Sequence, residues 1–212
     1  MNVQQLAKSD AFILRARDYR DPSASTAFGR FEKRGVLLRV AKGAYVLVPE
    51  AMREPGTNWR PPIESVALGL ASVEHGPSKV ALIGPSAART HGCLPRPLGV
   101  ATVSYPSTRT RTVETLVGTV RLYARSVDRM DVVNVSTDLA VGLATSIEMT
   151  MLDLLSGGPK KWPIETTDRT EAIRLLAGQA DWALVDKIAL RYRKKTALKN
   201  LAEFGLTRDS SL

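Results

Sequence analysis

Residues 12–48 constrain the fold of this chain more than any other stretch, because they join one helical pattern to two short β-prone runs. Asp21 and Pro22 suit the N-cap and the first position of a helix. Apolar residues then recur at the spacing of one helix face. They are Ala24, Ala27, Phe28 and Phe31. Gly35 is placed to end this helix, since glycine readily adopts the left-handed conformation of many helix ends.

Two β-prone runs follow, at residues 36–40 and 45–48, and the Ala-Lys-Gly-Ala segment between them has the length of a hairpin turn. Upstream, we expect a first helix over residues 2–8, a short strand over residues 12–14 and a second helix over residues 15–19. Helix, tight turn, helix and basic hairpin is the order of a winged helix-turn-helix, which is a DNA-binding arrangement.

The helix face opposite the apolar positions carries small, hydroxylated or basic residues, which are groups able to meet DNA. The candidate DNA-binding residues are Ser23, Ser25, Thr26, Arg30, Lys33 and Arg34 around this helix, with Arg39 and Lys42 on the hairpin. Further contacts to the DNA backbone are expected from Arg15, Arg17 and Arg20.

Charge favours DNA over the alternative, which is that this unit only docks another protein. Residues 1–50 hold nine basic and five acidic side chains, a net charge of about +4. The whole chain of 212 residues has a formal net charge of +9. Such an excess favours an anionic partner, and the phosphate backbone of nucleic acid is the simplest one.

The composition changes after the hairpin, where proline, glycine and charged residues are frequent. We therefore predict a winged helix-turn-helix domain over residues 1–49, a linker over residues 50–60, a larger α+β domain over residues 61–206 and a frayed tail over residues 207–212.

The larger domain is expected to hold a small sheet followed by a helical bundle, which makes the fold class α+β. Helices are predicted at residues 63–76, 85–91, 147–155, 172–176, 182–192 and 196–204, and strands at residues 99–105, 119–124 and 132–135. Arg109 and Arg111 are expected on a long connection between the first two strands.

A second basic feature lies near the end of the chain, where no acidic residue interrupts residues 187–199. Its possible backbone or partner contacts are Lys187, Arg191, Arg193, Lys194 and Lys195. A nucleic acid or an acidic protein could bind these cations, but a merely solvated helix surface is the default interpretation.

Few residues suggest catalysis or metal binding. Two histidines and the single Cys93 make no zinc set, and His91 and Cys93, on either side of Gly92, are expected to cap or pack a helix end. Residues 84–86 (Gly-Pro-Ser) could hold an anion on free backbone N–H groups, although capping is the plainer role. Glu148 and Asp153 have no acidic partner in any readable motif. We expect no cofactor, no metal and no ordinary enzyme.

The cysteine content and the length of the apolar runs bear on the cellular compartment. One cysteine cannot form an intrachain disulfide, and no secretory leader opens the sequence. No apolar run reaches the length of a membrane-spanning helix. A cytoplasmic protein without membrane attachment is expected.

The segment FILRARDYRDPSASTAFGRFEKRGVLLRVAKGAYVLV resembles the N-terminal domain of AbiEi-type antitoxins of bacterial type IV toxin–antitoxin systems, with RGVLLRVAKGAYVL as the most characteristic part. GPSAARTHG and SIEMTMLDLLSGGP resemble the second domain of the same family. The resemblance thus covers most of the chain.

This resemblance implies a regulator with two activities. Its N-terminal domain would repress its own operon by binding inverted-repeat DNA, and its C-terminal domain would counteract a cognate nucleotidyltransferase-like toxin without needing a stable complex. Repeated half-sites imply two protomers on DNA, which is compatible with a monomer in solution. Two alternatives stay open: inactivation of the toxin by phosphotransfer, and a ligand-responsive winged-helix repressor unrelated to a toxin.

Overall fold

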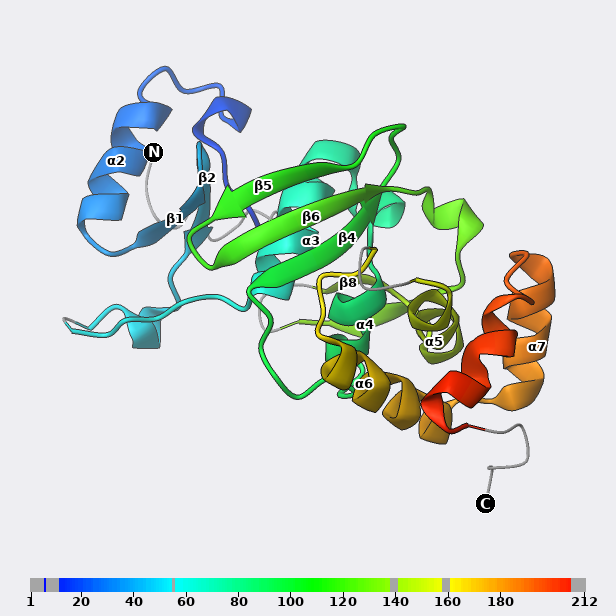
Figure 1. The fold of residues 1–212 in the computed structure, drawn as a ribbon. Helices are drawn as coiled ribbons and strands as arrows, with labels where there is room; N and C mark the ends of the chain where they lie inside the picture. The colour runs from blue at the N-terminus through cyan, green and yellow to red at the C-terminus, as the bar shows by residue number, and fades with distance from the viewer. Residues whose placement is uncertain (1–5, 7–11, 55, 138–140, 158–160, 207–212) are drawn as a thin grey trace.

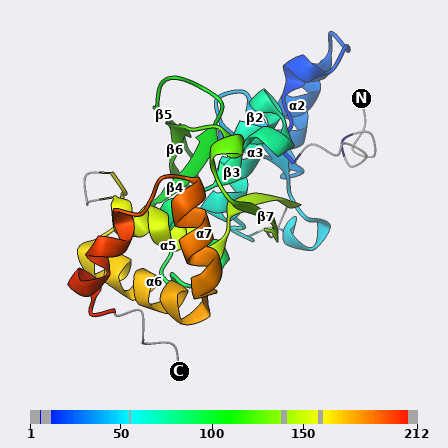
Figure 2. The ribbon, with the colours of Figure 1, turned by 90° about the vertical axis from the view of Figure 1, so that its right-hand side faces the viewer.

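A computed structural model describes residue 6 and residues 12–54, 56–137, 141–157 and 161–206. Figure 1 shows a helix, α2, and a two-stranded hairpin at one end of the molecule, next to a larger sheet. Figure 2 shows that the helices α5, α6 and α7 gather at the end remote from α2. The protein is a mixed α+β structure, as the sequence predicts.

The N-terminal unit, residues 12–48, contains the predicted helix and hairpin. Helix α2 spans Ala24–Lys33, and its buried residues are Ala24, Ala27, Phe28 and Phe31, the four that its periodicity predicts. Gly35 follows with φ +68°, a left-handed conformation that turns the chain toward the hairpin. Strands β1, Leu37–Ala41, and β2, Ala44–Leu47, pair in antiparallel fashion.

Three details of this unit differ from the predictions. The predicted helix over residues 2–8 lies outside the described residues except for Leu6, which is buried. Residues 12–14 form no regular strand, because only Leu14 makes an isolated bridge, to Tyr45. The predicted helix at residues 15–19 is a short 3-10 helix, Ala16–Asp18.

A six-stranded sheet forms the centre of the remaining chain, with strand order β5-β6-β4-β3-β8-β7. The strands are β3 (Ala81–Leu82), β4 (Val100–Tyr105), β5 (Arg111–Thr115), β6 (Gly118–Ala124), β7 (Val132–Ser136) and β8 (Val141–Thr145). The sequence predicts β4, β6 and β7 but not the other three. Arg111, expected on a connection, begins β5, and β4 pairs with β6 in parallel.

Helices cover both faces of this sheet. Helix α3, Ile63–His75, packs against the face that carries Ala101, Val103 and Val120. On the other face, Thr102 of β4 meets Ser86 of helix α4, Gly84–Thr90. Successive side chains of β4 therefore point alternately toward α3 and toward α4, as the period of two of a strand requires.

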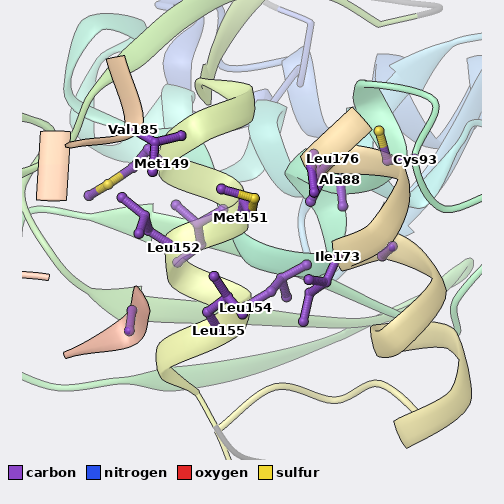
Figure 3. Close-up of a cluster of buried hydrophobic side chains, with 14 of the residues drawn as sticks. Ala88, Cys93, Met149, Met151, Leu152, Leu154, Leu155, Ile173, Leu176 and Val185 are labelled. Carbon is purple, nitrogen blue, oxygen red and sulfur yellow. The ribbon is translucent and has the colours of Figure 1, made fainter. Parts of the chain in front are cut away.

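The largest core surrounds helix α5, Ile147–Ser156. Methionine and leucine side chains of α5 pack against α6, Thr166–Gln179, and α7, Trp182–Arg191 (Figure 3). A 3-10 helix, Ala197–Phe204, covers the end of this group. These segments confirm the predicted helical C-terminal region. No helix in the described part of the chain is both long and apolar enough to cross a bilayer.

The N-terminal unit is attached to the sheet region through a shared apolar cluster and one backbone hydrogen bond. Ile13, Val40 and Val46 pack with Val66 of α3. The backbone N–H of Leu116, in the β5–β6 turn, donates to the carbonyl of Val40 at 2.8 Å. The 3-10 helix Glu50–Met52 lies within the predicted linker. The attachment therefore involves the body of the hairpin as well as the linker.

Candidate nucleic-acid interface

The turn before α2 is held by the side chain of Asp21. Its carboxylate accepts hydrogen bonds from the backbone N–H and the hydroxyl of Ser23, at 2.8 and 2.7 Å. These hydrogen bonds lower the pKa of Asp21. Helix α2 therefore begins at Ala24 after this turn, two residues later than the predicted start at Pro22. The turn fixes the direction of α2 relative to the segment that precedes it.

Four of the candidate residues share the outer face of α2. Ser23, Thr26, Arg30 and Lys33 are exposed, and helical geometry places them within about 80° of one another around the axis. Figure 1 shows α2 at the edge of the molecule, with the β1–β2 hairpin between α2 and the large sheet. This face combines two cations with two short hydroxyl side chains at the exposed edge of the molecule.

Ser25 and Lys42 lie away from the outer face of α2. Both line a cleft of about 620 Å³ between the N-terminal unit and the sheet region, which Arg17, Glu74 and Arg111 also line. Both side chains are exposed. The hairpin turn thus faces β5, because the hairpin is attached there, and it does not project away from the molecule on its own.

Arg15 borders the same cleft and has protein partners. Its guanidinium contacts the Asp18 carboxylate at 2.7 Å and donates to the carbonyl of Val73 on α3 at 3.2 Å. This places Arg15 as a link between the N-terminal unit and α3. Arg17 and Arg20 are exposed.

Arg34 and Arg39 lie at the other end of the N-terminal unit. They line a groove of about 520 Å³ with Arg53, Arg60 and Leu116. The structure therefore divides the predicted DNA-binding residues among the outer face of α2, the cleft and this groove. Of the eight contacts predicted on the helix and the hairpin, four lie on the outer face of α2, two in the cleft and two in the groove.

The basic residues near the C-terminus do not form one helix face. Lys187 and Arg191 are exposed on α7, which ends at Arg191. Arg193 and Lys195 follow the helix and are also exposed. Lys194 points inward, where its ammonium contacts the carboxylate of Asp153 at 2.7 Å. Lys194, predicted as a possible backbone or partner contact, is therefore engaged inside the protein, whereas the other four cations are exposed.

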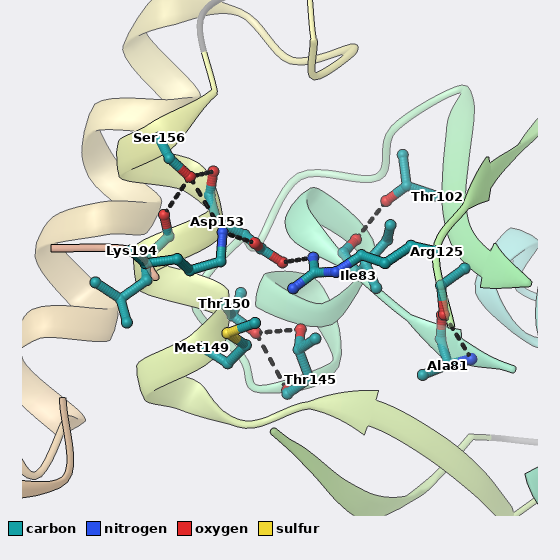
Figure 4. A network of polar contacts seen from close by, with 12 residues as sticks. Ala81, Ile83, Thr102, Arg125, Thr145, Met149, Thr150, Asp153, Ser156 and Lys194 are labelled. Carbon is teal, nitrogen blue, oxygen red and sulfur yellow. Dashed lines mark hydrogen bonds and ion pairs between the residues drawn. The ribbon is translucent and has the colours of Figure 1, made fainter. Parts of the chain in front are cut away.

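The buried ion group around Asp153 is not predicted from the sequence. Asp153 on α5 has no exposed surface, and Arg125, which follows β6, contacts it at 2.6 Å (Figure 4). The one available signal is an aspartate within an otherwise apolar stretch of helix, Met151–Leu155. Its partners are too distant in the sequence to be read from any spacing.

His91 and Cys93 do not act on each other as base and nucleophile. His91 Nε2 lies 2.7 Å from the carbonyl oxygen of Thr145. Cys93 is fully buried and accepts a hydrogen bond from Gln179 at 3.3 Å. Burial raises the pKa of the thiol, although the Gln179 hydrogen bond opposes this. His91 and Cys93 therefore pack at the end of α4, as the sequence predicts.

The Gly-Pro-Ser segment at the start of α4 is closed by packing. A Cβ on Gly84 would lie 2.6 Å from the ring of Trp162. Ser86 is fully buried, and its hydroxyl accepts a hydrogen bond from the Thr102 N–H at 2.8 Å. This segment serves the contact between α4 and the sheet, which is the structural role favoured from the sequence.

No group of three or more His, Cys, Asp or Glu side chains gathers as metal ligands would within the described ranges.

Comparison of the chain with protein-family models found no match, and comparison with curated proteins found no significant similarity. A function for this chain is therefore inferred from the geometry of the N-terminal unit and from the sequence resemblance.

Proposed function

We propose that this chain binds DNA through the outer face of α2, as the recognition helix of a winged helix-turn-helix. The observation that carries the proposal is the exposed set of Ser23, Thr26, Arg30 and Lys33 on one face of α2. Short hydroxyl side chains let a helix approach the major groove, and cations beside them contact bases and phosphates. The net charge of +9 supports an anionic partner.

We further propose that the chain is an AbiEi-type antitoxin that represses its own operon at inverted repeats and neutralises a nucleotidyltransferase-like toxin through its C-terminal part. The resemblance of three segments to that family supports this half of the proposal. It makes the protein a cytoplasmic regulator, monomeric in solution or dimeric on DNA.

DNA binding is tested by titrating the DNA upstream of the gene with the Arg30→Ala/Lys33→Ala double variant. We expect an affinity loss of at least tenfold and a salt dependence reduced by about one unit of slope for each lost phosphate contact. The matched control is Arg96→Ala/Lys199→Ala, which removes the same charge from exposed positions near the C-terminal helices, remote from α2 and outside the candidate contacts. Equal losses in both variants would show that only overall charge matters and that the α2 assignment is wrong.

The antitoxin role is tested by co-expressing the adjacent toxin candidate with the full-length protein. Restored growth is expected, both with the natural chain and with Arg30→Ala/Lys33→Ala, because neutralisation is assigned to the C-terminal part. Absence of growth rescue by the natural chain would overturn the antitoxin role and leave the DNA-binding role standing.

A ligand-responsive repressor is the second candidate, and the cleft of about 620 Å³ favours it. A small molecule in this cleft would contact the hairpin turn and α3 together, and so would couple its binding to the position of α2. This candidate predicts that a small ligand releases the protein from DNA and that the toxin candidate has no effect.

A further inference from the structure

A second pocket lies far from α2, where the end of β6, the end of α5 and the segment after α7 converge. It has a volume of about 460 Å³, which is within the range of small-molecule sites, roughly 300–1,000 Å³. Its charged lining residues are all cations within the described chain: Arg125, Arg129, Lys161, Arg193 and Lys194. The cleft and the groove at the N-terminal unit, by contrast, are both lined by carboxylates as well as cations.

Asp153 fixes two of these cations in place from beneath the pocket. Its two carboxylate oxygens contact Arg125 at 2.6 Å and Lys194 at 2.7 Å, and Figure 4 shows the two cations approaching it from opposite sides. Lys194 also donates to the hydroxyl of Ser156 at 3.3 Å. One buried negative charge therefore contacts two of the five cations, and Arg129, Lys161 and Arg193 make no ion pair with it.

Lys161 lies near the two cations that Asp153 holds, and these like charges disfavour its charged form. Burial lowers the pKa of Lys161; Asp153 opposes this shift, while Lys194 and Arg125 add to it. Arg193 has φ +56°, a left-handed conformation that is uncommon for a residue other than glycine. Repulsion between like charges of this kind is relieved when an anion binds between them.

The remaining lining combines the hydroxyl side chains of Thr110, Ser156 and Thr196 with the half-buried rings of Tyr123 and Tyr192. Trp162 is almost fully buried and lies beside Tyr123, with ring centroids 5.2 Å apart. Ile83 and Tyr192 complete this side. The hydroxyl of Tyr123 donates to the Lys161 carbonyl at 2.5 Å, which fixes the two residues relative to each other. A bare phosphate would use the cations alone, whereas a phosphate attached to a flat ring would also use the rings of Tyr123 and Tyr192.

We propose that this pocket binds a mononucleotide, with its phosphate between Lys161, Arg125 and Lys194 and its base against the half-buried rings of Tyr123 and Tyr192. Lys161 and Arg193 supply positive charge that Asp153 does not neutralise. The site is separate from the outer face of α2, so the inference does not depend on DNA binding by that helix.

The test is isothermal titration of the full-length protein with AMP and ADP, compared with adenosine, pyrophosphate and a short single-stranded oligonucleotide. We expect the two nucleotides to bind and adenosine to show at least tenfold weaker affinity. Pyrophosphate is expected to bind more weakly than ADP, because it lacks the ring.

Two variants and one control locate the binding. Lys161→Gln and Arg193→Gly each remove a cation that makes no ion pair with Asp153, and glycine suits the left-handed backbone at residue 193. Each variant is expected to weaken AMP binding at least fivefold with an unchanged melting temperature or a higher one. Lys187→Gln, on the exposed side of α7, should bind AMP as the natural chain does.

Three outcomes would overturn the proposal. The first is absence of binding by every phosphate compound. The second is AMP binding that is equal in the natural chain and both variants, which would place the nucleotide elsewhere. The third is binding of the oligonucleotide but not of AMP or ADP, which would assign the pocket to a nucleic-acid strand.

Discussion

At the scale of single residues, Asp153 joins three segments of the chain through one carboxylate. It lies on α5 without exposed surface, and its partners Arg125 and Lys194 come from the end of β6 and from the chain after α7. A buried charge is tolerable only when it is paired. The carboxylate therefore sets how α7 and the segment after it lie on the sheet region.

Asp153→Asn should lower the free energy of unfolding by about 3 kcal/mol, because it leaves two partly buried cations without their counter-charge. Urea denaturation at neutral pH measures this loss. Asp18→Asn is the control, since Asp18 pairs with Arg15 at an exposed position and an exposed pair contributes about 0–1 kcal/mol. Equal losses in the two variants would contradict the structural role of Asp153.

Cys93 gives a prediction on pH. Its raised pKa keeps the buried thiol protonated in the folded chain. The stability linked to this group is present below the ordinary thiol pKa of about 8.5 and is lost as the pH rises through the higher folded pKa. A thiol reagent at pH 8 should therefore modify Cys93 only as fast as the protein opens, and denaturant should speed the reaction. Rapid modification of the folded chain would contradict this.

At the scale of elements, the helix-and-hairpin unit is encoded locally. The periodicity of α2, the glycine after it and the short turn between β1 and β2 all lie within residues 21–48, and the sequence predicts each of them. Two glycines of this unit have opposite roles. Gly29 lies inside α2, whereas Gly35 holds φ +68° after it, and a Cβ at either position would meet no neighbouring atom within 4 Å.

Gly35→Ala should destabilise the protein by about 1 kcal/mol, because alanine resists the left-handed conformation. Gly29→Ala should stabilise it by about 0.5–1 kcal/mol, because alanine favours the helix interior. Thermal unfolding of both variants measures the difference. Since neither site has a steric obstacle, shifts of the same sign would show that the backbone after α2 is not left-handed at Gly35.

The sheet was harder to predict, for a physical reason. Strand β3 has two residues, and β5 is mostly exposed, so neither carries a readable hydrophobic pattern. Strand β8 holds a glycine that lies against Leu68 of α3. Pairing with distant strands creates these elements. The same limit applies to the candidate site, because the positions of Ser25 and Lys42 in the cleft depend on how the hairpin meets β5.

At the scale of the whole molecule, the N-terminal unit is held against α3 at a close approach. A Cβ on Gly69 of α3 would lie 2.4 Å from the ring of Phe12 and 2.7 Å from Ile13. Only a residue without a side chain fits there. Together with the Val40–Leu116 hydrogen bond, this contact defines the orientation of α2 relative to the sheet.

Gly69→Leu should force the N-terminal unit away from α3 while leaving the core around α5 intact. We expect faster amide exchange in β1 and β2 and easier proteolysis within residues 50–60, with unchanged exchange in α5. Gly178→Leu is the control, because nothing lies within 4 Å of a Cβ at that position. Unchanged exchange in the hairpin would mean that this contact does not hold the unit.

If α2 reads an operator as proposed, the attachment of the hairpin to the β5–β6 turn constrains how two half-sites are spaced. A recognition helix fixed to a bulky body cannot swivel to meet half-sites at any separation, so two bound copies would require one spacing. Inserting about five base pairs, half a turn of the double helix, between the repeats would place the second copy on the opposite side of the DNA. Operators of such a protein would therefore tolerate changes in the bases between half-sites far better than changes in their number.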